Sequence, residues 1–404
     1  MQIAILGRQS ALSIAELESL FGSDAITPVG DIAALVDADG IDIQRLGGSP
    51  KAGRVIAELT GDWQHVARDI EKHYSNAWRE VDHKITLGLS AYSSARPPAP
   101  RQLQALGLSL KKARKNHPGS LRLIPNADSE LSTATSHHNK LGLSPHKIEL
   151  LIVQAPSGIT YLAESTGSQN ITALAARDQA RPRTDAFVGM LPPKLARMMI
   201  NMSVIDGQPH DRQTPGAGAK TAARIFDPFC GTGTVLQEAL LMGYQAQGSD
   251  LSEKMVAYSQ ENIQWLSDKY KLSAAGFQIE QADATKHTWE ITNGTSVVCE
   301  TYLGQPFSAP PSPAKLREVR DNCNHIISSF LVNIHGQLPA GTSLTVAVPA
   351  WSDARGHFTH LPLTRQLDEL GYKRRQLKHA RSEQLLYHRD GQVVAREILL
   401  LERA

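Results

Sequence analysis

The chain has 404 residues, of which 41% are hydrophobic and 20% charged, and it is long enough for two or three globular domains. This composition excludes a disordered, collagen-like or coiled-coil protein. The formal net charge of +2 is unevenly distributed, because residues 91–200 carry 14 Lys and Arg against 6 Asp and Glu, whereas residues 1–90 carry 8 against 13.

The basic segment 91–200 predicts a polyanionic partner, and the alternative is a solvated basic surface without a ligand. No run of about 18 apolar residues is present, so we expect no membrane-spanning helix. The first residues, MQIAILGRQSALS, lack the pattern of a signal peptide. Cys230, Cys299 and Cys323 have neither the number nor the spacing of a disulfide framework or a zinc site. We therefore expect a cytoplasmic protein that binds no metal.

Two small α+β units are expected in the first 166 residues. The first unit, residues 1–92, has strand patterns at 1–7, 53–59 and 85–92 and helix patterns at 13–21 and 62–74. Ser13 and Glu16 form the capping-box pattern that marks the start of a helix. The proline-rich sequence SSARPPAP at 93–100 is expected to be a linker. The second unit, residues 101–166, has a helix pattern at 102–116 and strand patterns at 121–124, 147–153 and 160–164.

The pattern changes in the second half of the chain. Residues 167–200 combine a polar, basic loop with a helix that begins near Pro192 and Pro193. Strands then alternate with helices, and they are expected at 224–227, 244–249, 277–281, 296–299 and 343–348. Two apolar runs, 385–388 and 393–400, flank an Asp-Gly turn and predict a hairpin. We expect a Rossmann-like α/β domain at 201–404, with a mainly parallel sheet and a C-terminal antiparallel hairpin.

The segment 225–239, IFDPFCGTGTVLQEA, is the most informative part of the chain. A strand is expected to end at Asp227, Gly231 and Gly233 allow a tight turn, and a helix follows at once. The segment is not a P-loop, because no Gly-Lys-Ser/Thr follows. It is also a poor dinucleotide-binding fingerprint, because Leu236 stands where the third glycine is needed.

Acidic residues at the ends of the next two strands extend this pattern. Asp250 follows the second strand, where a carboxylate can bind a ribose diol, and Asp283 follows the third. Together with DPFCGTGT they resemble the Rossmann-fold methyltransferases that bind S-adenosylmethionine. The resemblance implies that the first-strand acid and the glycines hold the methionine part, Asp250 the ribose and Asp283 the adenine amine. The candidate cofactor contacts are Asp227, Phe229, Gly231, Gly233, Thr234, Asp250 and Asp283.

The resemblance extends over nearly the whole chain. The sequences LGR at 6–8, LSIAELE at 12–18, LGG at 46–48, GRVI at 53–56 and GMLPPKLARMMIN at 189–201 look like the THUMP-domain tRNA guanine-N2 methyltransferases. These archaeal and eukaryotic enzymes modify guanosine 10. The resemblance implies an N-terminal ferredoxin-like domain, a THUMP domain that holds the acceptor end of tRNA, a linker and a methyltransferase domain. The candidate phosphate contacts are Lys111, Lys112, Arg114, Lys115 and Arg122. tRNA is the implied partner, and the sequence identifies no small activator subunit.

One loop departs from the family pattern. After the fourth strand the family has an acid followed by Pro-Pro-aromatic, whereas this chain has CETYLG at 299–304. Glu300 replaces the Asp and is able to accept a hydrogen bond from a base amine. Tyr302 is the aromatic residue nearest to it and is expected to stack on a flipped base. Glu300 and Tyr302 are therefore the predicted catalytic residues.

Three functions remain open from the sequence. The first is an S-adenosylmethionine-dependent RNA methyltransferase that acts on a base amine, guanine N2, in tRNA. The second is a DNA amino-methyltransferase, which the same cofactor loop would serve but the THUMP-like segment argues against. The third is a catalytically inactive RNA-binding homologue, which the altered loop at 299–304 allows.

Overall fold

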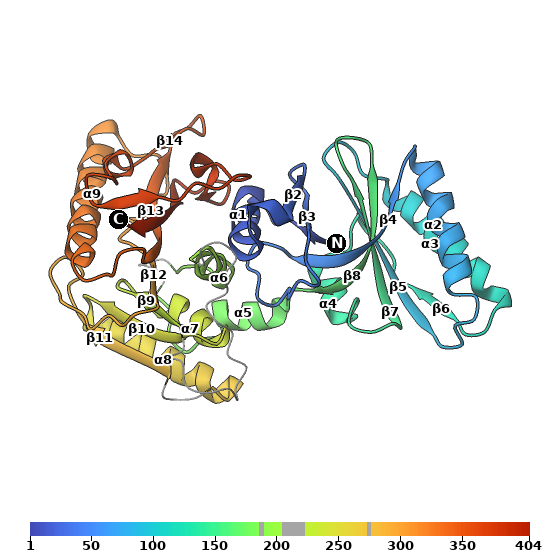
Figure 1. Ribbon diagram of the computed structural model, residues 1–404, viewed down its shortest axis with the longest axis horizontal. Helices are drawn as coiled ribbons and strands as arrows, with labels where there is room; N and C mark the ends of the chain where they lie inside the picture. Colours follow the sequence, from blue (N-terminus) through green and yellow to red (C-terminus); the bar gives the residue numbers. More distant parts are fainter. Residues whose placement is uncertain (186–189, 204–222, 273–275) are drawn as a thin grey trace. The chain divides into compact units, whose positions relative to one another are not determined.

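The computed structural model describes residues 1–185, 190–203, 223–272 and 276–404, which form two compact units. Unit 1 comprises Met1–Ile14 and Asp24–Ala173, and unit 2 comprises Ala15–Ser23 and Leu174–Ala404 (Figure 1). Gly189, which belongs to one of the family-like segments, lies outside the described residues. Across these described ranges, no helix is both long enough and apolar enough to cross a membrane.

Unit 1 is built on one eight-stranded sheet. Its strands lie in the order β2 (Ile26–Val29), β3 (Ala33–Val36), β1 (Gln2–Ile5), β4 (Lys51–Leu59), β8 (Thr160–Ser168), β7 (Lys147–Gln154), β5 (Ile85–Ser93) and β6 (Leu121–Leu123). The pairs are antiparallel except for β5 with β6 and with β7. Its helices are α2 (Trp63–Ala77), α3 (Pro100–Ala113) and α4 (Thr133–His138), whereas α1 (Ser10–Phe21) is divided between the two units after Ile14.

The structure divides this segment differently from the two expected α+β domains, 1–92 and 101–166. Strand β5, expected in the first domain, pairs with β6 and β7 of the second, and β4 pairs with β8. The linker 93–100 therefore connects β5 to the helix Pro100–Ala113, which packs on β5 and β6 of the same half of the sheet. The boundary expected at residue 92 is wrong. The pairing of β4 with β8 joins residues more than 100 positions apart, which local patterns do not reveal.

A side chain caps the start of α2, whereas the capping box expected at the start of α1 does not form. Asp62 caps α2, because its side chain accepts a hydrogen bond from the backbone N–H of His65. Ser13 is not the N-cap of α1, which begins at Ser10. The Ser13 hydroxyl instead lies buried inside the helix and donates to the carbonyl of Gly48 at 2.9 Å. A serine in a helix can satisfy its hydroxyl in this way when a backbone carbonyl packs beside it.

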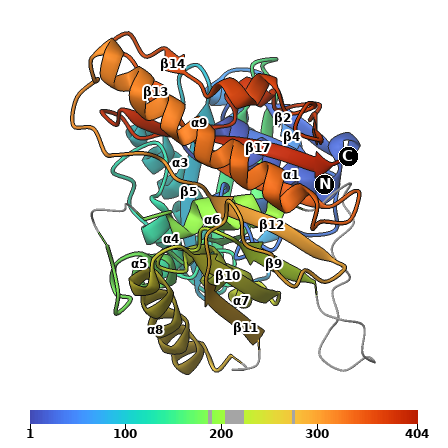
Figure 2. The same cartoon turned by 90° about the vertical axis from the view of Figure 1, so that its left-hand side faces the viewer.

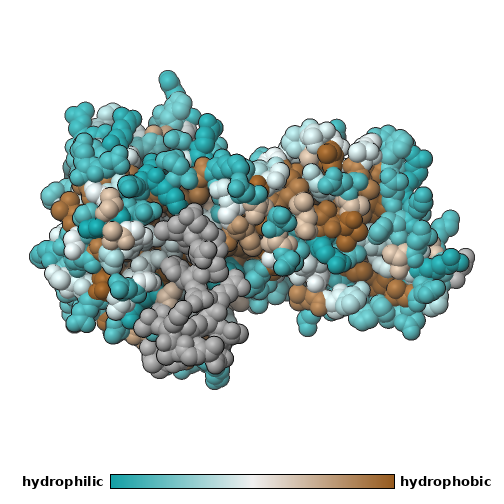
Figure 3. Space-filling view, viewed as in Figure 1, coloured by the Kyte–Doolittle hydropathy of each residue, from teal (hydrophilic) through white to brown (hydrophobic). Residues whose placement is uncertain are grey.

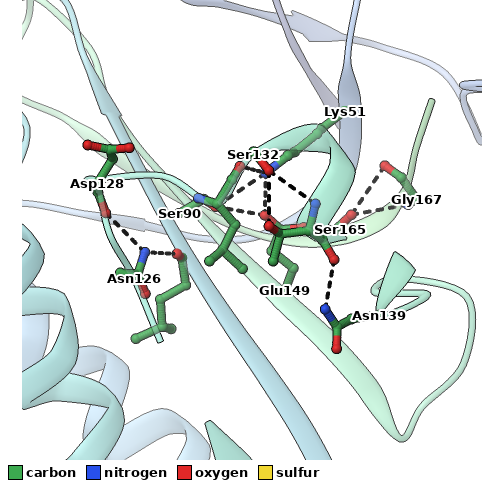
Figure 4. Close-up of polar contacts among 12 residues, drawn as sticks. Lys51, Ser90, Asn126, Asp128, Ser132, Asn139, Glu149, Ser165 and Gly167 are labelled. Atoms are coloured by element: carbon green, nitrogen blue, oxygen red, sulfur yellow. Dashed lines mark hydrogen bonds and ion pairs between the residues drawn. The ribbon is translucent and has the colours of Figure 1, made fainter. Parts of the chain in front are cut away.

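A buried ion pair holds a loop onto the sheet of unit 1 (Figure 4). Lys51 of β4 and Glu149 of β7 are almost completely buried, and their charged groups lie 2.5 Å apart. The Lys51 ammonium also donates to the carbonyl of Leu131, at 2.6 Å. Ser90 of β5 donates to Glu149 and accepts from the N–H of Leu131. The loop that precedes α4 is thus fixed by charge and hydrogen bonds rather than by apolar packing alone.

Unit 2 contains a mainly parallel sheet with helices on both faces (Figures 1 and 2). Its strands lie in the order β11 (Phe277–Gln281), β10 (Gln245–Asp250), β9 (Arg224–Asp227), β12 (Thr295–Glu300), β13 (Ser343–Ser352), β17 (Val394–Arg403) and β15 (Tyr372–Arg374). The first five run parallel, and β17 is antiparallel to its two neighbours. β14 (Phe358–Thr359) pairs with β13, and β16 (Leu386–Tyr387) with β17. This is the expected Rossmann-like fold, and β16 and β17 form the expected hairpin.

Four helices pack on the two apolar faces of this sheet: α6 (Pro193–Met202), α7 (Thr234–Leu241), α8 (Glu253–Tyr270) and α9 (Pro313–His335). α5 (Ile171–Gln179) precedes them, and unit 2 begins within it, at Leu174. Phe226, Val297 and Val346 share one core cluster with Ile327 and Phe330 of α9. α7 contacts β9 and β10 and also packs against α6 and α8. Successive residues of a strand point to opposite faces of the sheet. Because helices cover both faces of this parallel sheet, both faces need apolar residues.

Candidate cofactor and catalytic site

The loop between β9 and α7 is shaped by two glycines with positive φ. Gly231 has φ 51° and Gly233 has φ 83°, and α7 begins directly after them at Thr234. A Cβ on Gly233 would lie 2.3 Å from the hydroxyl oxygen of Ser259 on α8, so only glycine lets the two helices approach. A Cβ on Gly231 would meet no atom closer than 4.0 Å. The loop is therefore open at Gly231, beside the N-terminus of α7, where an anionic group is favoured.

Two carboxyl groups stand at the ends of the strands that flank this loop. Asp227 ends β9, is 2% exposed, and accepts a hydrogen bond from the N–H of Phe229 at 3.0 Å. Asp250 ends β10 and is half-buried. Its two oxygens accept from the N–H groups of Gly231, at 3.0 Å, and Ser252, at 2.9 Å. Asp250 thus fixes the glycine loop and closes the site on the β10 side.

The electrostatics of the site favour a positive charge. Burial raises the pKa of Asp227 well above its usual range, the Phe229 N–H opposes this, and the nearby carboxylates of Asp250 and Glu300 raise the pKa further. Burial also raises the pKa of Asp250, against the opposing hydrogen bonds from Ser252 and Gly231. Three acidic groups therefore converge at the carboxyl edge of the sheet, where open α/β sheets bind their ligands.

Three of the predicted cofactor contacts have other partners within the protein. Asp283 follows β11 and is partly exposed; its carboxylate accepts from the hydroxyl and N–H of Thr285, which lower its pKa. The hydroxyl of Thr234 accepts from Arg181 at 2.7 Å. The ring of Phe229 packs edge-on against Phe330 at 4.9 Å between centroids. Their roles toward a cofactor stay predictions.

A buried cluster that the sequence patterns did not reveal fixes α7 behind the loop. The Glu238 carboxylate, fully buried, accepts from the Nε atoms of Arg177 and Arg197, each at 2.5 Å. Burial alone would lower the pKa of Arg177, but Glu238 and Tyr270 together outweigh burial and raise it. These arginines come from α5 and α6, so α5, α6 and α7 are joined at one carboxylate. Helical spacing could have placed Glu238 on the buried face of α7, one turn after Thr234.

The predicted catalytic loop follows β12 at the same edge of the sheet. Glu300 is partly buried, and the side chain of Tyr302 is 43% exposed. Thr301 is buried between them, and both its N–H and its hydroxyl donate to the carbonyl of Ala347 on β13. Gly304 has φ 78°, and a Cβ there would lie 2.8 Å from Val319 of α9. The loop is thus anchored at Thr301 and Gly304, while Tyr302 projects outward.

Sequence reasoning also missed the partner of Glu300. Nε of Arg396 on β17 donates to Oε1 of Glu300, and both side chains are largely buried. The two residues are 96 positions apart, and only the sheet order brings them together.

Four of the five predicted RNA contacts lie exposed in unit 1, and one does not. Lys111, Lys112, Lys115 and Arg122 are exposed, and hydrophilic residues cover the outer side of α2 and α3 in Figure 3. Arg114 is 3% exposed, and its guanidinium donates to the carbonyls of Trp78, Val81 and Pro118. The structure does not present Arg114 to a phosphate, because the residue is buried and its two terminal amino groups donate to carbonyls inside the protein.

Among the described residues, no group of three or more His, Cys, Asp or Glu side chains could hold a metal ion. The three cysteines are buried and free, and burial raises the pKa values of all three thiols. A buried thiol with a raised pKa is a poor nucleophile.

The sheet order, the glycine loop and the strand-end acids give unit 2 the fold of Rossmann-type methyltransferase domains. Residues 214–300 match the family described as UPF0020, RMKL-like, methyltransferase domain. The resemblance to tRNA guanine-N2 methyltransferases is confirmed by relatives that bear this name. The chain is 29% identical over 178 residues to the tRNA (guanine(10)-N2)-dimethyltransferase of Methanothermobacter thermautotrophicus, and 32% identical over 119 residues to that of Pyrococcus abyssi.

These matches cover only parts of the chains. The first covers 44% of this chain and 44% of the relative, and the second covers 30% and 26%. The chain thus matches less than half the length of these relatives. Among solved structures, TrmN from Thermus thermophilus aligns over 100% of this chain and 99% of its own, with a TM-score of 0.53 and 15% identity. A possible methylase from Clostridium difficile aligns over 98% and 97%, with a TM-score of 0.50 and 13% identity. At this identity the likeness shows the fold alone.

Proposed function

We propose that this protein is an S-adenosylmethionine-dependent RNA methyltransferase that modifies the N2 amine of a guanine in tRNA. The observation that carries the proposal is the convergence of Asp227, Asp250 and Glu300 at the carboxyl edge of a methyltransferase sheet. The names of the sequence relatives support the choice of tRNA and of guanine N2. A cytoplasmic setting agrees with such a substrate.

The residues of the site fit the proposed cofactor. S-adenosylmethionine carries a sulfonium and an ammonium group, and its bound form supplies an electrophilic methyl group. Asp227 and Asp250, whose pKa values are raised by burial, would be stabilised in their charged forms by such a cation. The N–H groups at the start of α7, beside the open position at Gly231, suit the carboxylate of the methionine part. Asp250 would accept from the ribose hydroxyls, and Asp283 from the adenine amine.

Glu300 and Tyr302 would hold the target base. The exposed ring of Tyr302 offers a flat surface for a base that has left its stack. The carboxylate of Glu300 would accept a hydrogen bond from the exocyclic amine and so orient its nitrogen toward the methyl group. In the transfer the carbon–sulfur bond breaks, the carbon–nitrogen bond forms, and the amine releases one proton to Glu300 or to water.

Unit 1 would bind the RNA. The exposed Lys111, Lys112, Lys115 and Arg122 give it cations that are free to contact phosphates, as expected of a THUMP-like domain. Arg114 would support this surface from inside by fixing the backbone that follows α2.

Single-turnover assays with methyl-labelled cofactor and total tRNA, followed by mass spectrometry of the nucleosides, test the proposal. The wild-type chain should produce N2-methylguanosine. Glu300→Gln should lower transfer by at least 100-fold and leave cofactor affinity nearly unchanged. Glu318→Gln is a matched control, because Glu318 is an exposed residue of α9 paired only with Lys315 among described residues, and it should behave like wild type. Cofactor and tRNA binding without transfer to any RNA would refute the proposal in favour of an inactive RNA-binding homologue.

A further inference from the structure

The ion pair between Glu300 and Arg396 spans three strands of the sheet in unit 2. Glu300 of β12 lies in register with Ala347 of β13, and Arg396 of β17 lies in register with Pro349, two residues further along β13. Residues two apart point to the same face of a strand. The Arg396 side chain therefore crosses one face of β13 and reaches the carboxylate of Glu300 on β12.

The contact uses one oxygen of the carboxylate only. Nε of Arg396 donates to Oε1 of Glu300, and no described residue donates a hydrogen bond to Oε2. The exposed fractions are 11% for the Arg396 side chain and 16% for that of Glu300, so solvent screens the pair less than a surface pair. Oε2 is thus the oxygen that remains available to a ligand.

The surroundings of Glu300 explain why it needs a cation. The Asp227 carboxyl at the end of β9 is close enough for Glu300 to raise its pKa, and the thiol of Cys299, the preceding residue, is similarly affected. Asp250 adds a further negative charge at this edge. Arg396 is the cation that contacts the Glu300 carboxylate at this acidic edge. The residues directly after Glu300, 301–304, contain no proline, and Thr301 is held to β13 through its N–H and its hydroxyl.

We propose that Arg396 is the positioning residue of Glu300: it fixes the carboxylate through Oε1, so that Oε2 faces the amine of the target base. This role rests on the proposed function. Arginine suits it better than lysine, because the planar guanidinium restricts the orientation of the carboxylate, whereas an ammonium is a point charge.

The test compares Arg396→Gln and Arg396→Lys with wild type in single-turnover assays on tRNA, across a range of pH. Arg396→Gln should lower the rate of transfer by about 10- to 100-fold, with little change in the affinity for cofactor or tRNA. The pH–rate profile of this variant should differ from that of wild type, because the charge beside the reacting amine is lost. Arg396→Lys should restore the profile but only part of the rate.

Two controls separate positioning from general damage. Arg320→Gln removes a partly exposed arginine of α9 that pairs only with Asp321 among described residues, and it should leave rate and pH profile unchanged. In the Glu300→Gln background, Arg396→Gln should cause no further loss of rate, since the two residues act as one unit. An active wild type with an unaltered rate and profile in Arg396→Gln would overturn the role of Arg396 alone. A wild type that methylates no RNA would overturn the proposed function and this role with it.

Discussion

Replacement of Glu238 by glutamine should strongly destabilise the methyltransferase domain. Glu238 is the shared partner of Arg177 and Arg197, and the exposed fractions of these side chains are 1%, 5% and 12%. The variant keeps the shape of the side chain but leaves two guanidinium groups facing a neutral amide in a site with little water. Loss of one partner from a buried ion pair costs about 3–5 kcal/mol. For a unit of this size that corresponds to a fall in Tm of roughly 6–20 °C.

Differential scanning calorimetry of the full chain measures this change, and Glu261→Gln is the matched control. Glu261 pairs with Arg183 at 2.6 Å, but both side chains are nearly half exposed. Its loss should cost about 1 kcal/mol or less, because water solvates both charges when the pair is broken. If the two variants lost the same free energy of unfolding, within about 0.5 kcal/mol, the argument that burial makes the Glu238 cluster stabilising would be refuted.

The remaining predictions concern the cofactor site and unit 1. Asp250→Asn should weaken binding of S-adenosylmethionine by about 1.5–3 kcal/mol, the contribution of a hydrogen bond to a charged group, and unchanged affinity in calorimetry would remove Asp250 from the site. Arg114→Ala should lower thermal stability by a few kcal/mol, since it leaves buried carbonyls unpaired, without changing the salt dependence of tRNA binding. Lys111→Ala should instead reduce the slope of log affinity against log salt by about one, and the reverse pattern would contradict the assignment of the two residues. Asp227→Asn should raise the Tm of the cofactor-free protein at neutral pH. The pKa of Asp227 is raised in the fold, so the wild type loses stability as pH rises above about 4, the unfolded value. The higher Tm of the variant should therefore disappear below that pH. A difference in Tm that stays constant at every pH would contradict this account of Asp227.

Local patterns predicted the parallel strands well. The bounds of β9 and β11 agree with those expected, because each strand holds two apolar residues and an acidic residue lies at its end or shortly after it. The glycine loop was also predictable, since a positive φ at Gly231 and Gly233 is a property of the residues themselves.

Long-range pairing could not be read in the same way. No local signal shows that β4 pairs with β8, or that Arg396 meets Glu300 across β13. The burial of Arg114, by contrast, could have been predicted from its position on the helix. It lies four residues after Leu110, on the helical face that buries Leu103 and Leu106, yet it stands in a basic run that suggested an exposed surface.

The position of β17 in the sheet has a consequence for synthesis of the protein. The strand lies between β13 and β15, although it follows both in the sequence. During translation, most of the exposed edge of β13 keeps unpaired N–H and C=O groups until residues 394–403 have left the ribosome. Open strand edges are templates for pairing with other chains. We therefore expect a premature stop codon before Val394 to give an aggregating product rather than a folded, shortened chain.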